Sequence, residues 1–292
     1  MTEEEALKII KSFDDRMDYS SKNVLAYIEA LSFFIQETKD PKYMMELGGY
    51  YYEKREFDLA LKYYEMAAEC DYDKAYEGLA YIWYYGRTGT KDYKLAFEYF
   101  HKLMDKGNLV AMYKIADMYR NGYYVEKSSE MYEKLVTKAY QKAKDLKDPF
   151  DPVPEIYIRY AHILSDAGKI EEACEKYQYA KAFLGERLMY SAFFGDLTIM
   201  KLLIEDMYKI MEFDEIFFDL FDLYHVLKSP CKVSFGCVNR EYVVESFMDG
   251  EECRIRLGSR VYESIDDFFM NASIGGVKLI AIHDRLYGFE II

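Results

Sequence analysis

The chain has 292 residues, of which 51% are hydrophobic, and its formal net charge is −14 at pH 7. This apolar content supports a large buried core and excludes a globally disordered chain. The acidic surface repels phosphate backbones, so we expect no nucleic-acid binding. No apolar run reaches the roughly 18 residues that a membrane-spanning helix needs.

The cysteines and the N-terminal residues indicate in which cellular compartment the protein is expected. The cysteines are odd in number and form no CxxC pair, which fits thiols in a reducing cytosol better than a disulfide framework. They are Cys70, Cys174, Cys231, Cys237 and Cys253. The N-terminal residues 1–5 are acidic, whereas a secretory signal begins with basic residues. We therefore expect a soluble, cytoplasmic protein that does not bind membranes.

Residues 1–40 are predicted to form a pair of helices. The apolar residues of the first helix fall on one face at helical spacing, and Ser20 or Ser21 can cap the second helix. No repeat signature is visible in this stretch. We interpret it as an N-terminal cap that covers the first repeat of a longer array.

A step of 36 residues organises the next part of the chain, predicted at residues 41–228. Five positions recur at that step, which is typical of stacked helical hairpins. The recurring pairs are Ala75 and Ala111, Leu79 and Ile115, Ala80 and Ala116, Trp83 and Tyr119, and Gly86 and Gly122. The array is predicted to begin at Asp40, an N-cap residue that precedes a proline.

Small residues and rings alternate within these hairpins. Gly48 and Ala60 let two helices approach closely, and the ring of Tyr64 fills the space beside them. The 31 tyrosines of the chain are therefore mainly structural in this interpretation. The third repeat departs from the pattern, because Tyr132 stands where a small alanine is expected.

Three prolines between Asp148 and Pro154 interrupt the array, since proline cannot continue a helix. A fourth hairpin follows, with a short turn at residues 167–169. Two additional helices are predicted at residues 187–228, broken near residues 212–214. The second of them is apolar on nearly all sides, which predicts that it is buried between the array and the C-terminal residues.

The residue pattern changes from helical spacing to strand-like alternation after Pro230. Alternating and β-branched segments predict strands, and Ser264 is expected to begin a short helix. We predict a small α+β domain at residues 229–292. The predicted fold class is thus mostly α, with an α-α superhelix of helical hairpins followed by this α+β domain.

Three segments resemble the first helix of Sel1-like repeats, which are relatives of the tetratricopeptide class: Leu47–Tyr51, Leu79–Trp83 and Ile115–Tyr119. The resemblance covers about residues 41–185, and the C-terminal segment resembles no family. It implies a right-handed superhelix whose concave face is lined by the first helices. The residues carried onto that face as candidate partner-binding residues are Met45, Tyr52, Glu77, Tyr81, Tyr84, Tyr85, Tyr113, Arg120 and His162.

The aromatic cluster on this face has two interpretations. Exposed rings at Tyr81, Tyr84 and Tyr85 can supply binding energy at low entropic cost. The same rings can instead pack against a neighbouring hairpin or the C-terminal domain. The sequence does not favour one over the other.

No motif in the sequence indicates catalysis, a cofactor or a metal. The four histidines have no metal-ligand spacing, and the chain has no HExxH, phosphate loop or GxGxxG motif. We therefore predict a non-catalytic scaffold that binds a peptide or protein segment in its groove. The alternative is an acidic immunity-type inhibitor that neutralises a basic toxin or nuclease, for which binding would depend strongly on salt. An enzyme seated in the C-terminal domain is the third hypothesis.

Overall fold

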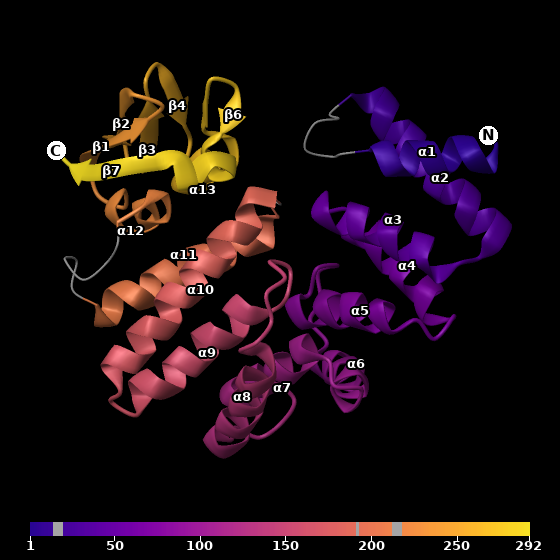
Figure 1. Cartoon of the computed structure of the whole chain (residues 1–292). Helices are drawn as coiled ribbons and strands as arrows, with labels where there is room; N and C mark the ends of the chain where they lie inside the picture. Colours follow the sequence, from indigo (N-terminus) through magenta and orange to yellow (C-terminus); the bar gives the residue numbers. More distant parts are fainter. Residues whose placement is uncertain (14–19, 191–192, 212–217) are drawn as a thin grey trace. The chain divides into compact units, whose positions relative to one another are not determined.

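The computed structural model describes residues 1–13, 20–190, 193–211 and 218–292 (Figure 1). The chain packs as two compact units, Met1–Leu135 and Val136–Ile292. The predicted fold class is confirmed, because helices that pack in sequence order precede an antiparallel sheet near the C-terminus. The predicted domain boundaries at residues 40 and 228 stay a prediction.

The first unit is built from helices that pack against their neighbours in the sequence. Within pairs, α1 packs on α2, α3 on α4 and α5 on α6, and α2–α3, α4–α5 and α6–α7 contacts join one pair to the next. These are the predicted helical hairpins, coloured indigo to purple in Figure 1. Their bounds are α1 Glu3–Ser12, α2 Ser21–Thr38, α3 Pro41–Glu53, α4 Phe57–Ala68, α5 Asp73–Tyr85, α6 Tyr93–Asp105, α7 Leu109–Asn121 and α8 Ser129–Ala143, which continues beyond Leu135.

Side-chain caps fix where these helices begin. Ser20, rather than Ser21, caps α2 by accepting the backbone N–H of Asn23. Asp40 caps α3 with Pro41 in the first turn, as the sequence predicts, and Asp92 caps α6. Each cap accepts a backbone N–H that the helix itself cannot satisfy.

The 36-residue step is repeated in the geometry of the turns. Gly86 and Gly122 end α5 and α7 in the left-handed conformation, with φ of 63° and 73°. The turn after each is closed by equivalent backbone hydrogen bonds, from Asp92 N–H to the Trp83 carbonyl (3.0 Å) and from Ser128 N–H to the Tyr119 carbonyl (3.1 Å). The sequence repeat is therefore a structural repeat. Glycine is favoured at the C-terminal end of both α5 and α7 because φ is positive there.

The ring of Tyr64 on α4 lies in a slot between two glycines of different hairpins. A Cβ atom placed on Gly48 of α3 would lie 2.7 Å from this ring, and one on Gly78 of α5 would lie 2.6 Å from it. The close approach predicted for Gly48 is confirmed, and Gly78 extends it to the next hairpin. We call these three residues the ring slot.

Tyr132, which replaces the expected alanine in the third repeat, is buried on α8. Its equivalents at the preceding steps, Ala60 and Ala96, are also buried. The larger ring is accommodated with a cation beside it, because the Arg120 guanidinium lies 5.2 Å from the ring centroid and donates a hydrogen bond of 3.3 Å to the hydroxyl.

The second unit begins with the end of α8 and the predicted fourth hairpin. Helices α9 (Val153–Asp166) and α10 (Ile170–Tyr190) are joined by a turn at Gly168, and α11 (Phe194–Ile210) packs on α10. The predicted second helix of residues 187–228 is wrong in length. Its described part is a 3₁₀ turn, η2 (Leu220–Asp222), and the short α12 (Leu223–Val226). Asp219 caps η2, so a new helical turn begins there. The predicted break at 212–214 lies outside the described residues.

The C-terminal part of the second unit is a five-stranded antiparallel sheet of order β4-β3-β2-β1-β7 (orange to yellow in Figure 1). Ser264 caps α13, as predicted. The bounds are β1 Cys231–Cys237, β2 Arg240–Asp249, β3 Glu252–Leu257, β4 Arg260–Tyr262, α13 Ile265–Asn271, the β5–β6 hairpin Ser273–Ile274 and Val277–Lys278, η3 Leu279–Arg285 and β7 Leu286–Ile291.

Several described residues of the apolar segment before the sheet are buried, whereas Phe218 and Val226 are half-buried. Leu220, Phe221, Leu223 and Tyr224 are buried. Tyr224 stacks on Phe269 of α13 at 3.9 Å between ring centroids. The Phe221 ring lies 4.9 Å from that of His283, whose Nε2 donates to the Gly185 carbonyl of α10 at 2.9 Å. This segment therefore joins the helices of the second unit to its sheet region.

Two buried cations on α10 tie the second unit together. Lys181 Nζ donates to Asp222 Oδ2 at 2.6 Å and lies 3.0 Å from Asp219 Oδ2. Six residues further along, Arg187 donates to Glu155 of α9 at 2.8 Å and to Asp196 of α11 at 3.0 Å. Burial raises the pKa of Asp196 to about 6, although Arg187 acts in the opposite direction.

Candidate functional site

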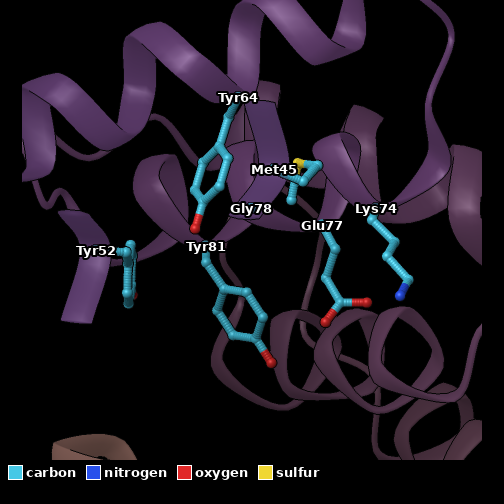
Figure 2. A pocket seen from close by; sticks show the side chains of 7 residues that line it. All are labelled: Met45, Tyr52, Tyr64, Lys74, Glu77, Gly78 and Tyr81. Atoms are coloured by element: carbon cyan, nitrogen blue, oxygen red, sulfur yellow. The ribbon is translucent and has the colours of Figure 1, made fainter. Parts of the chain in front are cut away.

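A pocket of about 310 Å³ opens in the first unit between helices α3, α4 and α5. Figure 2 shows the side chains that surround it. Helices α3 and α5 are the first helices of two consecutive hairpins and contact each other directly. The lining residues are Met45 and Tyr52 on α3, Tyr64 on α4, and Lys74, Glu77, Gly78 and Tyr81 on α5.

Four residues of the predicted concave face line this pocket: Met45, Tyr52, Glu77 and Tyr81. They reach it because α3 and α5 occupy equivalent places in their hairpins, so equivalent helix faces point to the same space. The structure thus brings these four side chains to one cavity. That they bind a partner stays a prediction.

Glu77 places a carboxylate in the pocket wall. Its Oε2 accepts a hydrogen bond of 3.1 Å from Asn108 Nδ2, the residue that caps α7. Burial raises the pKa of Glu77, while the Asn108 hydrogen bond and the nearby charges of Lys74 and Lys114 oppose that shift. Since burial prevails, the carboxylate is less well stabilised here than in water.

Tyr81 joins the pocket to a cluster of rings around a buried lysine. The Lys114 side chain on α7 is only 5% exposed, and its ammonium donates to the Tyr85 hydroxyl at 2.6 Å. The ammonium also lies 4.8 to 5.4 Å from the centroids of four rings. We call these rings the tyrosine cage: Tyr81, Tyr84, Tyr85 and Tyr113.

The rings of the tyrosine cage, which include Tyr81, Tyr84 and Tyr85 of the aromatic cluster, differ in exposure. Tyr84 is 9% exposed and Tyr113 is 3% exposed, so both rings are part of the packing between hairpins and not of an open surface. Tyr81 is half-buried, with its hydroxyl 3.1 Å from that of Tyr113. Tyr85 remains 39% exposed. The rings gather here because they surround a cation, a role that helix position alone does not reveal.

Tyr52 forms the opposite wall and also holds a cation. Arg87 Nε donates to the Tyr52 hydroxyl at 3.1 Å, and its guanidinium lies 4.7 Å from the centroid of the Tyr85 ring. Burial raises the pKa of Tyr52, and the charge of Arg87 opposes the shift. Tyr52 therefore stays a neutral hydroxyl at physiological pH.

The two remaining predicted residues lie away from the pocket lining. Arg120 is exposed on α7 and contacts Tyr132. His162 belongs to the second unit, where its Nε2 lies 2.8 Å from Asp206 Oδ2 and its ring lies 5.9 Å from that of Tyr177. That contact joins α9 to α11, which is a structural role for His162.

Over the described ranges, no group of three or more His, Cys, Asp or Glu side chains is placed to hold a metal ion. In the same part of the chain, no helix has both the length and the hydrophobicity that crossing a bilayer requires.

Three pocket residues were not predicted as part of the face: Tyr64, Lys74 and Gly78. Tyr64 was expected to fill space between helices, and it does so while also lining the cavity (Figure 2). Gly78 follows Glu77 directly. Its lack of a side chain could have indicated that another group packs closely against α5 at this point. Lys74 precedes Glu77 by three residues, a spacing that puts both on one face of α5.

No family model matches the chain, and no curated protein matches it. Among solved structures, a Sel1 repeat protein from Oxalobacter formigenes is similar, with 22% identity over 61% of this chain and 67% of that chain and a TM-score of 0.47. A protective antigen of uropathogenic Escherichia coli strains that displays an SLR fold shares 13% identity over 72% of this chain and 49% of that chain, with a TM-score of 0.45. The first of these is named after the repeat class that residues 41–185 resemble.

Proposed function

We propose that this chain is a non-catalytic protein-binding scaffold whose first unit holds a segment of a partner protein at the pocket between α3 and α5. The observation that carries the proposal is the convergence of Met45, Tyr52, Glu77 and Tyr81 on one cavity. Rings and a thioether offer apolar contact area, and a carboxylate and hydroxyls at the edge can orient a ligand.

The size of the pocket favours a single side chain of a larger ligand. Its volume of about 310 Å³ lies at the lower end of the roughly 300–1,000 Å³ typical of ligand pockets. A long side chain of an extended peptide fills such a space, while its backbone can lie across the faces of α3 and α5. The five cysteines are free thiols, which supports a cytoplasmic setting as part of this proposal.

The test is a selection of random dodecapeptides displayed on phage against the full chain, followed by affinity measurements on a pocket-filling variant. Met45→Trp adds bulk to the pocket wall. The matched control is Met104→Trp, which adds the same bulk at a half-buried position of α6 outside the pocket lining. Thermal unfolding of both variants verifies that they fold.

We expect the selected peptides to bind Met45→Trp at least ten-fold more weakly than wild type, and Met104→Trp within about two-fold. Equal binding to all three proteins would show that the pocket does not hold the peptide. Failure to select any peptide above background would count against the scaffold itself.

A further inference from the structure

The carboxylate of Glu77 is the feature of the pocket that points to a class of ligand. It is half-buried, and its one described hydrogen-bond donor is the Asn108 amide. Because burial outweighs the neighbouring positive charges, the ionised carboxylate gains stability from any further donor that enters the cavity. A charged donor gives more than a neutral one.

The walls of the pocket suit a cation on an apolar stem. Tyrosine faces attract cations within about 6 Å of the ring centroid. Two of the lining rings already do so inside this chain: the Arg87 guanidinium lies 5.7 Å from the centroid of Tyr52, and the Lys114 ammonium lies 5.3 Å from that of Tyr81. Met45 and the ring of Tyr64 offer apolar surface for a methylene chain.

Lys74 opposes a cationic ligand, as do the charges of Arg87 and Lys114 at the lining rings. The Lys74 side chain lines the pocket but is exposed, so its ammonium can turn into solvent when a second cation approaches. The net charge of −14 acts in the other direction at long range, because it attracts basic segments to the whole molecule. We therefore expect Lys74 to reduce the affinity for a cation without reversing the preference.

We propose that the pocket selects a lysine or arginine side chain from a basic, extended segment of a partner protein, with Glu77 as the residue that determines this specificity. The inference rests on the proposed function, since it names the side chain that the scaffold holds. The stem of the entering residue lies against Met45, Tyr64 and Tyr81, and its charged head lies at the Glu77 carboxylate.

The test uses three fluorescein-labelled dodecapeptides in which alanine alternates with lysine, norleucine or glutamate. Binding to the full chain is followed by fluorescence anisotropy at 150 mM salt. Glu77→Gln removes the pocket charge and keeps the shape. The matched control is Glu98→Gln on α6, which removes the same charge from an exposed side chain that lies 4.0 Å from Lys94.

The expected result is that wild type binds the lysine peptide at least ten-fold more tightly than the norleucine peptide. Glu77→Gln should remove most of this difference, whereas Glu98→Gln changes it less than about two-fold. Lys74→Met should strengthen binding of the lysine peptide, since it removes the competing ammonium.

Three results would overturn the inference, and they separate it from the proposed function. If norleucine binds as tightly as lysine and Met45→Trp weakens both, the pocket holds a side chain but does not select a cation. If the glutamate peptide binds best and Glu77→Gln strengthens it, the selectivity is reversed. If Met45→Trp affects none of the peptides, the proposed site fails together with the inference.

Discussion

Each compact unit buries a lysine, and the two lysines have different surroundings. Lys114 of the first unit is 5% exposed and lies among the four rings of the tyrosine cage, with a hydroxyl as its hydrogen-bond partner. Lys181 of the second unit is 7% exposed and lies against the carboxylates of Asp222 and Asp219. Removing the first cation leaves neutral rings beside it, whereas removing the second leaves the buried carboxylate of Asp222.

The comparison indicates that the first unit depends on shape and the second on charge. Neutral rings and the ring slot need no ionised partner, while the carboxylates of Asp222, Glu155 and Asp196 are buried and need their cations. Changes of charge should therefore act on the second unit, and changes of volume on the first. The single tryptophan, Trp83, lies on α5, so its fluorescence reports unfolding of the first unit.

The largest effect is expected when the same substitution is made at both lysines. Lys181→Met leaves Asp222 buried without its cation and should lower the free energy of unfolding of the second unit by about 3–5 kcal/mol. Lys114→Met leaves neutral rings around the site, with the half-buried Glu77 as the anion nearby, and should change the first unit by only about 1 kcal/mol. Native-state hydrogen exchange measures both units in one experiment. Equal losses from the two substitutions would refute the contrast between them.

The second-largest effect is a dependence of the stability of the second unit on pH, which arises from Asp196. The pKa of this carboxyl is raised to about 6 in the folded state from an ordinary value of 3.8. Between these two pH values the folded state therefore keeps a proton that the unfolded state has released. The stability that Asp196 contributes is complete below about pH 4 and is lost as the pH rises through 6. The difference amounts to about 3 kcal/mol at about 1.4 kcal/mol per pH unit.

The comparison of wild type with Asp196→Asn isolates this contribution, because the other carboxyl groups are common to both proteins. Urea unfolding of the two proteins between pH 4 and pH 8, with hydrogen exchange to assign the second unit, should show a steeper loss for wild type. Parallel pH profiles would mean that Asp196 is already ionised at pH 4.

The smallest effect compares two neighbouring glycines of α3. Gly48→Ala places a Cβ atom 2.7 Å from the Tyr64 ring, which cannot retreat because Gly78 closes the other side of the slot. We expect a loss of about 1–3 kcal/mol from overpacking. Gly49→Ala meets nothing within 4 Å and should stabilise the helix by up to about 1 kcal/mol. Trp83 fluorescence during urea unfolding measures both, and a loss at Gly49 or none at Gly48 would contradict the ring slot.

The architecture of the first unit could be predicted because its determinants are local. The caps at Asp40 and Asp92 and the turn at Gly86 depend on residues within a few positions of each other, and the 36-residue step repeats them. The strand and helix starts near the C-terminus were predictable for the same reason. At η2 the local signal misled, since the apolar run predicts one helix whereas Asp219 caps a separate 3₁₀ turn.

The buried charges could not be predicted, because their partners are distant in sequence. Lys181 meets Asp222 at a separation of 41 residues, and Arg187 meets Glu155 at 32. The burial of Tyr84 has the same origin, since Lys114 contacts its ring from the neighbouring helix α7. Four of the seven lining residues of the pocket belong to the face predicted from repeat position. Its carboxylate environment, set by Asn108 and Lys114, required the three-dimensional arrangement.

The ring slot has a kinetic consequence for whatever enters the pocket. Tyr64 and Gly78 belong both to the slot and to the pocket lining, so this wall is fixed before a ligand arrives. A cavity with a preset wall requires no reorganisation there, and the observed association rate should rise in proportion to ligand concentration without a plateau. Differences in affinity among ligands would then reside in how long each one stays bound.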